Sequence, residues 1–199
     1  MSIFDSLKPI KKSEYEGLSP WLILGIEREA TKRLSGFLTK DKEYIAKIRL
    51  GAISDTYDRE GRVVFRKVLE EPSEKKVKKV LKSFLGKIEQ KPPVFSAKKI
   101  KGKKLYELAR KGIKVKIKPQ RVEIYKIDFL SYKFPYLKIK VSCSSGTYIR
   151  SLAHDIGGKL SCGGYLEELC RTKIGEFELR KAVRLSRLSY RNWQNFLFN

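Results

Sequence analysis

Residues 91–112 read KPPVFSAKKIKGKKLYELARKG, a proline pair followed by a basic run and an apolar pattern. The prolines predict an extended entry, because proline fixes its own φ and restricts the residue before it. Five lysines then stand between positions 98 and 104. Leu105, Leu108 and Ala109 recur at helical spacing before a basic turn and a glycine. The stretch predicts a basic loop leading into a short helix, and the lysines alone fit either solvated surface or a binding site.

Positive charge is the main deviation in composition. The 199 residues include 45 Lys and Arg against 22 Asp and Glu, a net charge of +23. This excess predicts attraction to a polyanion, and with 10 Phe and 10 Tyr it favours RNA or DNA over a membrane surface. Adaptation to heat is the alternative, but it raises both signs together, whereas cations here outnumber anions about two to one.

Cysteine usage and the N-terminal sequence bear on where the protein works. Cys143, Cys162 and Cys170 show no CxxC spacing, so neither a metal site nor a disulfide framework is expected. No apolar run approaches membrane-spanning length, and the first residues lack an apolar signal core. We therefore expect a soluble, cytoplasmic protein without membrane contact, and we also expect a monomer.

Hydrophobic periodicity along the chain predicts a mixed α+β domain. Alternation predicts strands at 42–50, 62–68, 121–132, 136–143 and 172–179. Helical spacing predicts helices at 27–38, 73–90, 147–160, 164–171 and 181–199. Hairpins outnumber βαβ units, so we expect one domain over residues 1–199 with a mainly antiparallel sheet flanked by helices.

A second long stretch, residues 141–177, reads VSCSSGTYIRSLAHDIGGKLSCGGYLEELCRTKIGEF. This stretch and residues 91–112 each resemble a signature segment of the bacterial tRNA pseudouridine synthase B family, in the family's order. The resemblance covers residues 29–179 well, and residues 1–28 are interpreted as a diverged N-terminal part. It implies the pseudouridine synthase fold, with an RNA-binding cleft across a mixed sheet. The family's separate C-terminal RNA-binding domain is not expected, because too little chain follows.

The resemblance implies an isomerase that converts a T-arm uridine of tRNA to pseudouridine. The reaction breaks the N-glycosidic bond, turns the base and rejoins it through carbon, so the base must leave its stack. No metal or cofactor is implied. The family uses a catalytic aspartate, a tyrosine that packs on the target base, and an arginine that pairs with the aspartate. The expected partner is the T-arm stem-loop of tRNA.

Two residues match the family's tyrosine and arginine. Tyr44, in Asp41-Lys42-Glu43-Tyr44, matches the stacking tyrosine, although spacing alone favours a strand tyrosine packed half in the core. Arg171, in Leu169-Cys170-Arg171-Thr172, matches the arginine that holds the carboxylate, and the ordinary alternative is a helix-end arginine capping carbonyls. Arginine suits the role because it stays charged and can grip a carboxylate with two parallel hydrogen bonds.

The catalytic carboxylate lacks a direct counterpart. The family carries it in a Gly-x-Leu-Asp-Pro segment, and no Leu-Asp-Pro occurs in this chain. Counting back from Tyr44, and from the motif at 29–32, puts Glu16 at the position of the aspartate. Glutamate is one methylene longer, and a misplaced catalytic group can lose orders of magnitude in rate. Asp5 is the weaker alternative. Either the chain is a diverged or inactive relative, or the N-terminus of its reading frame is altered.

Predicted RNA contacts come from both stretches. Gly146-Thr147-Tyr148-Ile149-Arg150 matches a family motif whose glycine permits a tight turn and whose helix N-terminus, with Arg150, can face phosphate. The same motif fits a purely structural role. The turn at 55–58 also fits the family near the cleft, and His154 is assigned no general-base role. The residues expected to bind RNA are Lys98, Lys99, Lys101, Lys103, Lys104, Tyr148 and Arg150.

Three hypotheses follow. The first is a tRNA uridine isomerase with Glu16 in place of the aspartate. The second is a catalytically inactive relative that binds tRNA or helps it to fold, with the salt-sensitive affinity of a basic cleft. The third is a general binder of nucleic acid, which would hold duplex DNA and tRNA equally well.

Overall fold

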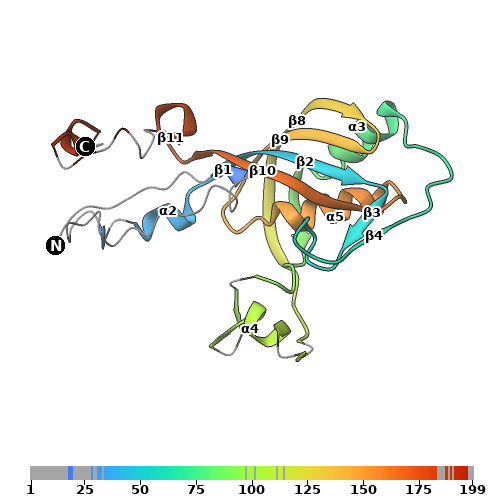
Figure 1. The fold of residues 1–199 in the computed structure, drawn as a ribbon, viewed down its shortest axis with the longest axis horizontal. Coiled ribbons are helices and arrows are strands. Elements are labelled where there is room, and N and C mark those ends of the chain that lie inside the picture. Colours follow the sequence, from blue (N-terminus) through green and yellow to red (C-terminus); the bar gives the residue numbers. More distant parts are fainter. Residues whose placement is uncertain are drawn as a thin grey trace.

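The structure is a computed structural model. It describes residues 18–19, 28, 31–32, 34–96, 98–100, 102–110, 112–113, 115–182, 187, 189 and 191–196. Within these ranges, one large sheet forms the centre of the molecule, and two small two-stranded sheets are separate from it (Figure 1). None of the described helices has both the length and the apolar composition needed to cross a bilayer.

The large sheet is mixed and mainly antiparallel, with the strand order β1-β10-β2-β9-β8-β5 and with β11 beside β10. Among the described strands of this sheet, the short β1 alone pairs in parallel, against β10. The expected α+β class with a mainly antiparallel sheet is confirmed. The strands are β1 (Leu18–Ser19), β2 (Lys42–Leu50), β5 (Gly86–Gln90), β8 (Gln120–Lys133), β9 (Tyr136–Cys143), β10 (Gly164–Ile174) and β11 (Phe177–Glu178).

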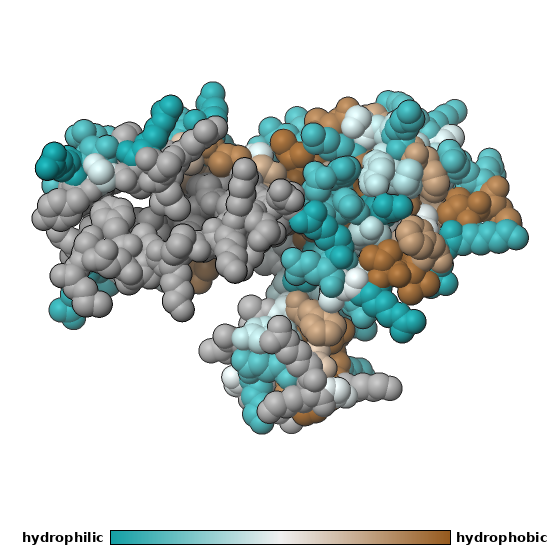
Figure 2. Space-filling view, viewed as in Figure 1, coloured by the Kyte–Doolittle hydropathy of each residue, from teal (hydrophilic) through white to brown (hydrophobic). Residues whose placement is uncertain are grey.

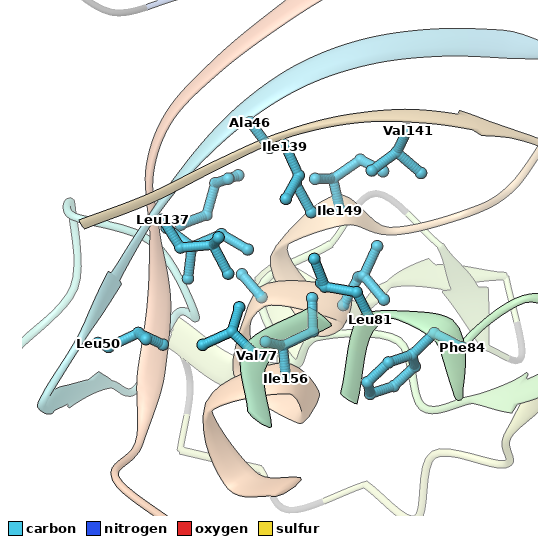
Figure 3. Close-up of a cluster of buried hydrophobic side chains, with 14 of the residues drawn as sticks. Ala46, Leu50, Val77, Leu81, Phe84, Leu137, Ile139, Val141, Ile149 and Ile156 are labelled. Carbon is cyan, nitrogen blue, oxygen red and sulfur yellow. The ribbon is translucent and has the colours of Figure 1, made fainter. Parts of the chain in front are cut away.

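Two helices, α3 (Glu74–Lys82) and α5 (Ile149–Lys159), cover one face of this sheet and bury the core (Figures 1 and 3). Figure 3 shows side chains of β2 and β9 pointing at both helices. Each fully buried Leu or Ile contributes about 1.5–3 kcal/mol by leaving water. Core residues include Ala46, Ile48, Leu50, Val77, Leu81, Leu137, Ile139, Val141, Ile149, Leu152 and Ile156.

Four of the five alternating stretches contain the strands predicted for them, whereas residues 172–179 are divided by a turn between the end of β10 and β11. The strand predicted at 42–50 is β2, with Ala46, Ile48 and Leu50 buried and the residues between them half-buried. The pair predicted at 121–132 and 136–143 is the β8–β9 hairpin. The return strand predicted at 62–68 is realised as β4 (Val63–Phe65), which pairs with β3 (Ala52–Ser54). The period-two pattern identifies β2 and β9 because one face of each strand is buried, whereas the residues of β4 are half-buried or exposed.

The helix predicted at 164–171 is wrong, because these residues form β10. Two β-bulges in β10, at Leu166/Glu168 and Arg171/Lys173, each insert one residue against β2. The β10 residues that oppose inward-facing positions of β2 are therefore three, two and three positions apart along the chain. They are Leu166, Leu169, Arg171 and Ile174. That spacing imitates a helical pattern, and the sequence alone does not reveal the bulges.

One other predicted helix is shorter than expected, and two lie partly outside the described residues. The helix predicted at 73–90 begins as expected, with the Ser73 hydroxyl accepting from the Lys76 amide, but ends at Lys82. Gly86, at φ +87°, then starts β5. Of the helix predicted at 27–38, the described Arg28, Thr31 and Lys32 are helical, a turn follows at residues 34–35, and α2 (Gly36–Thr39) overlaps its end. Within 181–199, Lys181, Arg187 and Trp193–Phe196 are in 3₁₀ turns, and part of this range lies outside the described residues.

Residues 91–119 leave the sheet between β5 and β8 and return to it, and we call this segment the excursion. It contains β6 (Lys99–Ile100), β7 (Lys103–Lys104) and α4 (Leu105–Arg110), the short helix predicted for this stretch. Figure 1 shows the excursion standing away from the large sheet on its own. Its first residue follows Gln90 and its last precedes Gln120, which are register partners in β5 and β8.

Candidate functional site

Tyr44 and Arg171 lie side by side on neighbouring strands. They are direct register partners in the antiparallel β2–β10 pair, so both side chains project from the same face. The Arg171 side chain hydrogen-bonds the Tyr44 hydroxyl. Burial, and then the nearby Cys143, raise the pKa of the Tyr44 phenol, against the opposing effect of the Arg171 charge. The phenol is therefore neutral at physiological pH.

The surroundings of Tyr44 hold its end of the sheet in place. The Lys42 amine donates to the backbone carbonyls of Phe37, Leu38 and Lys40, at 3.1, 2.7 and 2.6 Å, which fixes the end of α2 against β2. Burial raises the pKa of the Cys143 thiol to about 11, so it stays protonated and is not a nucleophile. The Thr147 hydroxyl donates to the Ser144 carbonyl at 2.8 Å, in the turn between Cys143 and the start of α5.

The segment that follows Glu16 runs beside the strand of Arg171. In β1, Leu18 pairs with Leu169 and Ser19 with Cys170, the residue before Arg171. Glu16 itself and Asp5 lie outside the described residues. Strand β1 thus begins two positions after Glu16. Its last residue, Ser19, pairs with the residue that precedes Arg171.

A second charged group centres on Arg150, in the first turn of α5. Its Nη1 lies 2.7 Å from Asp58 Oδ2, and its Nη2 donates to the Phe95 carbonyl at 3.0 Å. One guanidinium therefore joins α5, the turn after β3 and the start of the excursion. The side chains are 28% and 17% exposed, so solvent screens this pair only partly. We call Ser54, Thr56, Asp58, Phe95 and Arg150 the Asp58–Arg150 cluster.

The turn between β3 and β4 orients the Asp58 carboxylate. Asp58 Oδ1 accepts from the Thr56 hydroxyl at 2.6 Å and from the Glu60 amide at 3.1 Å, which leaves Oδ2 for Arg150. Because the Thr56 proton is used on Asp58, the Ser54 hydroxyl is the donor in the 3.1 Å contact between these two hydroxyls. The ion pair is thus held by a hydrogen-bonded chain rather than by two mobile side chains.

Tyr57 gives α5 a second contact with this turn. It adopts a left-handed backbone, φ 64°, which is uncommon for a bulky residue and costs about 1–2 kcal/mol. Its ring stacks on His154 with centroids 4.0 Å apart and planes 15° apart. His154 stands one helical turn after Arg150, so α5 contacts both Tyr57 and Asp58. The His154 ring is therefore the part of α5 that packs against Tyr57.

The lysines predicted to bind RNA belong to the excursion, but one is engaged elsewhere. The Lys98 amine donates to the Gln120 side-chain oxygen at 2.8 Å. Lys103, in β7, is exposed. Only the backbones of Lys99 and Lys104 are described, and Lys101 lies outside the described residues. Figure 2 shows hydrophilic side chains among apolar ones on both the main body and the excursion.

Tyr148, also predicted to bind RNA, is the N-cap residue of α5. Its amide donates to Gln90 Oε1 at 2.8 Å, and its carbonyl accepts from Gln90 Nε2 at 3.1 Å. The sequence prediction missed Asp58 as the partner of Arg150, and it missed the two glutamines that flank the excursion. The motif at 55–58 was a usable signal for Asp58, whereas Gln90 was hidden at the end of a predicted helix.

No group of three or more His, Cys, Asp or Glu is placed to hold a metal ion within the part of the chain that the structure describes.

Comparison with known protein families identifies two matching models. The model of the TruB family pseudouridylate synthase N-terminal domain matches residues 20–149. The model of the tRNA pseudouridylate synthase B C-terminal domain matches residues 150–196. The boundary between the two falls inside α5, whose neighbour β10 belongs to the large sheet. Glu16 precedes both matched ranges.

Several curated relatives are named tRNA pseudouridine synthase B. The relative from Clostridium tetani is 45% identical over 84% of this chain and 58% of its own length. The relative from Protochlamydia amoebophila is 45% identical over 87% of this chain and 68% of its own length. The relative from Endomicrobium trichonymphae is 40% identical over 91% of this chain and 83% of its own length. The chain therefore spans little more than half of the first of these relatives.

Two solved structures share the fold. A chain of a Cbf5-Nop10-Gar1 complex superimposes with a TM-score of 0.61 at 28% identity, over 83% of this chain and 41% of that chain. A chain of an H/ACA RNP bound to a substrate RNA containing 2′-deoxyuridine gives 0.57 at 25% identity, over 84% and 39%.

Proposed function

This chain belongs to the TruB family of pseudouridylate synthases, and from that premise we propose that it isomerises a T-arm uridine of tRNA to pseudouridine. The observation that carries the proposal is the direct register pairing of Tyr44 with Arg171, because two family positions 127 residues apart in sequence meet on one face of the sheet. The proposal includes tRNA as the partner of a single copy of the chain, acting in the cytoplasm. It also treats residues 1–199 as one catalytic domain.

The proposed roles divide the chemistry between three groups. Tyr44 packs on the extruded base, since its neutral phenol offers an aromatic face and can share a hydrogen bond with Arg171. Arg171 keeps a carboxylate ionised beside the glycosidic bond. Glu16 supplies that carboxylate, and its proposal is supported by β1, which brings the following residues beside Cys170. The product is an isomer of the substrate, so no atom is gained or lost.

Arg150 is a second arginine that can act on the reacting group. Its pairing with the oriented Asp58 carboxylate holds the guanidinium in one place, and it leaves further N–H donors beyond those used on Asp58 and Phe95. A fixed cation near the flipped nucleotide stabilises developing negative charge without reorganisation during the reaction. We therefore assign Arg150 to electrostatic support of the reaction, and the excursion lysines to the tRNA backbone.

A T-arm stem-loop transcript tests the proposal directly. The full chain is mixed with the RNA at single-turnover ratio, and pseudouridine is mapped by chemical probing. We expect product in the parent, and a loss of about 100-fold or more in rate for Glu16→Gln. A conservative control, Glu176→Gln, changes an exposed carboxylate that pairs with Lys40 and leaves the rate unchanged.

Two results separate the remaining hypotheses. Salt-sensitive binding of the stem-loop without any product, at high protein concentration, would indicate a relative that only binds RNA. Product formation that is unaffected by Glu16→Gln would keep the activity and reject Glu16, and Asp5→Asn is then the next variant to measure.

A further inference from the structure

Gln90 and Gln120 face each other where the excursion leaves and rejoins the sheet. They are register partners at the ends of β5 and β8, so the two ends of the excursion (residues 91–119) meet at this pair. Gln90 is fully buried, which is unusual for a glutamine and requires its amide to be satisfied. The contacts of both side chains lead to the same place, the turn at 144–148 before α5.

Gln90 grips this turn at two points. Its Oε1 accepts from the Tyr148 amide at 2.8 Å and its Nε2 donates to the Tyr148 carbonyl at 3.1 Å. Gln120 holds the turn from the other side, because its Nε2 donates to the Gly146 carbonyl at 2.7 Å. Tyr148 is the N-cap of α5 and makes no side-chain cap of its own, and Gln90 Oε1 satisfies the backbone amide of this N-cap residue, as the second half of a capping box does.

The first turn of α5 also reaches back to the start of the excursion. The Ser151 hydroxyl donates to the Lys91 carbonyl at 2.7 Å, and Arg150 donates to the Phe95 carbonyl at 3.0 Å. The position of the Arg150 guanidinium therefore depends on where the excursion lies. This dependence matters because the same guanidinium donates to the Asp58 carboxylate.

Gln120 Oε1 connects the two glutamines to a lysine of the excursion. Gln120 Oε1 accepts from Lys98, an excursion lysine proposed to contact the tRNA backbone. A phosphate that draws the Lys98 amine away would break this bond and free Gln120 to shift against Gly146. Binding of RNA to the excursion can thus reach the first turn of α5 through one hydrogen-bonded path.

We propose that Gln90 and Gln120 are positioning residues that couple the excursion to Arg150, so that RNA held by the excursion sets the guanidinium in its working place. We call this pair the glutamine clasp. The inference rests on the proposed function for its catalytic readout. The clasp acts through hydrogen bonds to the backbone of Gly146 and Tyr148, and neither glutamine contacts the reacting atoms.

Gln120→Glu is the decisive variant, because it keeps an acceptor for Lys98, replaces the donor to Gly146 with an oxygen and adds one negative charge. We expect the single-turnover rate on the T-arm stem-loop to fall about 10- to 100-fold, while the RNA dissociation constant changes less than about twofold. Gln194→Glu makes the same chemical change at an exposed position and is expected to leave rate and affinity unchanged. An unchanged rate in Gln120→Glu overturns the proposal.

A double-mutant cycle separates coupling through Arg150 from a general structural defect. If the clasp acts through Arg150, Gln120→Glu lowers the rate less than about twofold when Arg150 is already Lys, since coupled residues are not additive. The same fold-loss in both backgrounds means that Gln120 acts independently of Arg150, and this result also overturns the proposal.

Hydrogen–deuterium exchange gives a readout that needs no catalysis. In the parent, adding the stem-loop should slow amide exchange in a peptide covering residues 145–152, and in Gln120→Glu this slowing should be lost although the RNA still binds. Equal slowing in both proteins overturns the clasp. A parent that binds RNA and shows the slowing but forms no pseudouridine contradicts the proposed function and leaves the clasp supported.

Discussion

Two charged clusters on opposite faces of the sheet have similar exposure and different architecture. In the Asp58–Arg150 cluster, the paired side chains are 17% and 28% exposed. On the other face lies the Glu43 cluster, Glu43 with Lys140, Ser142 and Thr172, whose paired side chains Glu43 and Lys140 are 22% and 37% exposed. Exposure alone would assign these two pairs comparable value.

The difference lies in what each cluster joins. The Glu43 cluster connects neighbouring strands β2, β9 and β10, whose register the backbone ladders already determine. The Asp58–Arg150 cluster connects a turn, the start of the excursion and a helix, three segments without a shared ladder. An ion pair therefore matters for geometry where the backbone does not determine the geometry itself. We expect the Asp58–Arg150 cluster to control activity and the Glu43 cluster to adjust stability.

The largest effect should come from Arg150→Gln. The substitution removes the contacts to Asp58 and Phe95 and leaves the Asp58 carboxylate partly buried without its counter-charge. We expect the single-turnover rate of pseudouridine formation to fall by about 100-fold or more. Lys140→Gln is the matched control on the opposite face, and its rate should match the parent. Comparable losses in the two variants would remove the contrast between the clusters.

A smaller loss is expected from Gly61→Ala, which acts on the turn that holds Asp58. A Cβ at position 61 would lie 2.2 Å from both Asp55 Oδ1 and Thr56 Oγ1, so these short side chains must move. Because Thr56 orients Asp58, the rate should fall about tenfold, and stability should drop by about 1–3 kcal/mol in chemical denaturation.

Gly158→Ala is the matched control for this substitution. An added Cβ at Gly158, inside α5, meets nothing within 4 Å. Alanine there should raise stability by about 0.5–1 kcal/mol and leave the rate unchanged. Equal behaviour of the two alanine variants would show that the turn does not position Asp58.

The same contrast explains how much of the molecule its sequence predicts. The bounds of β2 and the β8–β9 hairpin follow from local alternation, because burial of one face imposes period two. The pairing of Arg150 with Asp58 joins residues 92 positions apart, and no local pattern encodes it. Motif resemblance supplied Tyr44 and Arg171 as candidates, and the β2–β10 register then made them neighbours.

Two failures of prediction have identifiable physical causes. The bulges of β10 shift the inward-facing side chains by one residue each, so a strand carries a helix-like spacing. Gln90 is buried through two hydrogen bonds to Tyr148, 58 residues away, although a glutamine in a lysine-rich stretch is typical of exposed surface. In both cases tertiary contacts override the local preference.

The Glu43 cluster predicts a pH-dependent stability. Burial raises the pKa of Glu43, but hydrogen bonds from Thr172 and Lys140 outweigh it, so the pKa lies below its usual 4.5. The stabilisation is therefore present above the unfolded-state pKa and is lost as pH falls through the lower folded-state pKa. At pH 7, Glu43→Gln should be less stable by at most about 1 kcal/mol, because solvent screens the pair.

Denaturant titrations at pH 7 and at about pH 3 check this sign. The difference between parent and Glu43→Gln should shrink at the lower pH, and the single-turnover rate at pH 7 should be the same in both. A gap that widens on acidification would mean that the carboxylate destabilises the fold. A lowered rate would mean that the two faces are not functionally separate.

The smallest effect is expected at a charge that belongs to neither cluster. Lys75 stands in the first turn of α3, where the helix dipole disfavours a cation, and Lys78 and Lys79 lie on the same helical face. Lys75→Glu should raise stability by about 0.5 kcal/mol in denaturant titration, with most of the gain lost in 1 M salt. The rate at saturating RNA should not change, since α3 packs against the core and contributes no residue to either cluster. If the gain in stability in Lys75→Glu equals the loss in stability in Glu43→Gln, the Glu43 cluster contributes no more to stability than an exposed helix charge. The Asp58–Arg150 cluster would then be the one cluster with a distinct role.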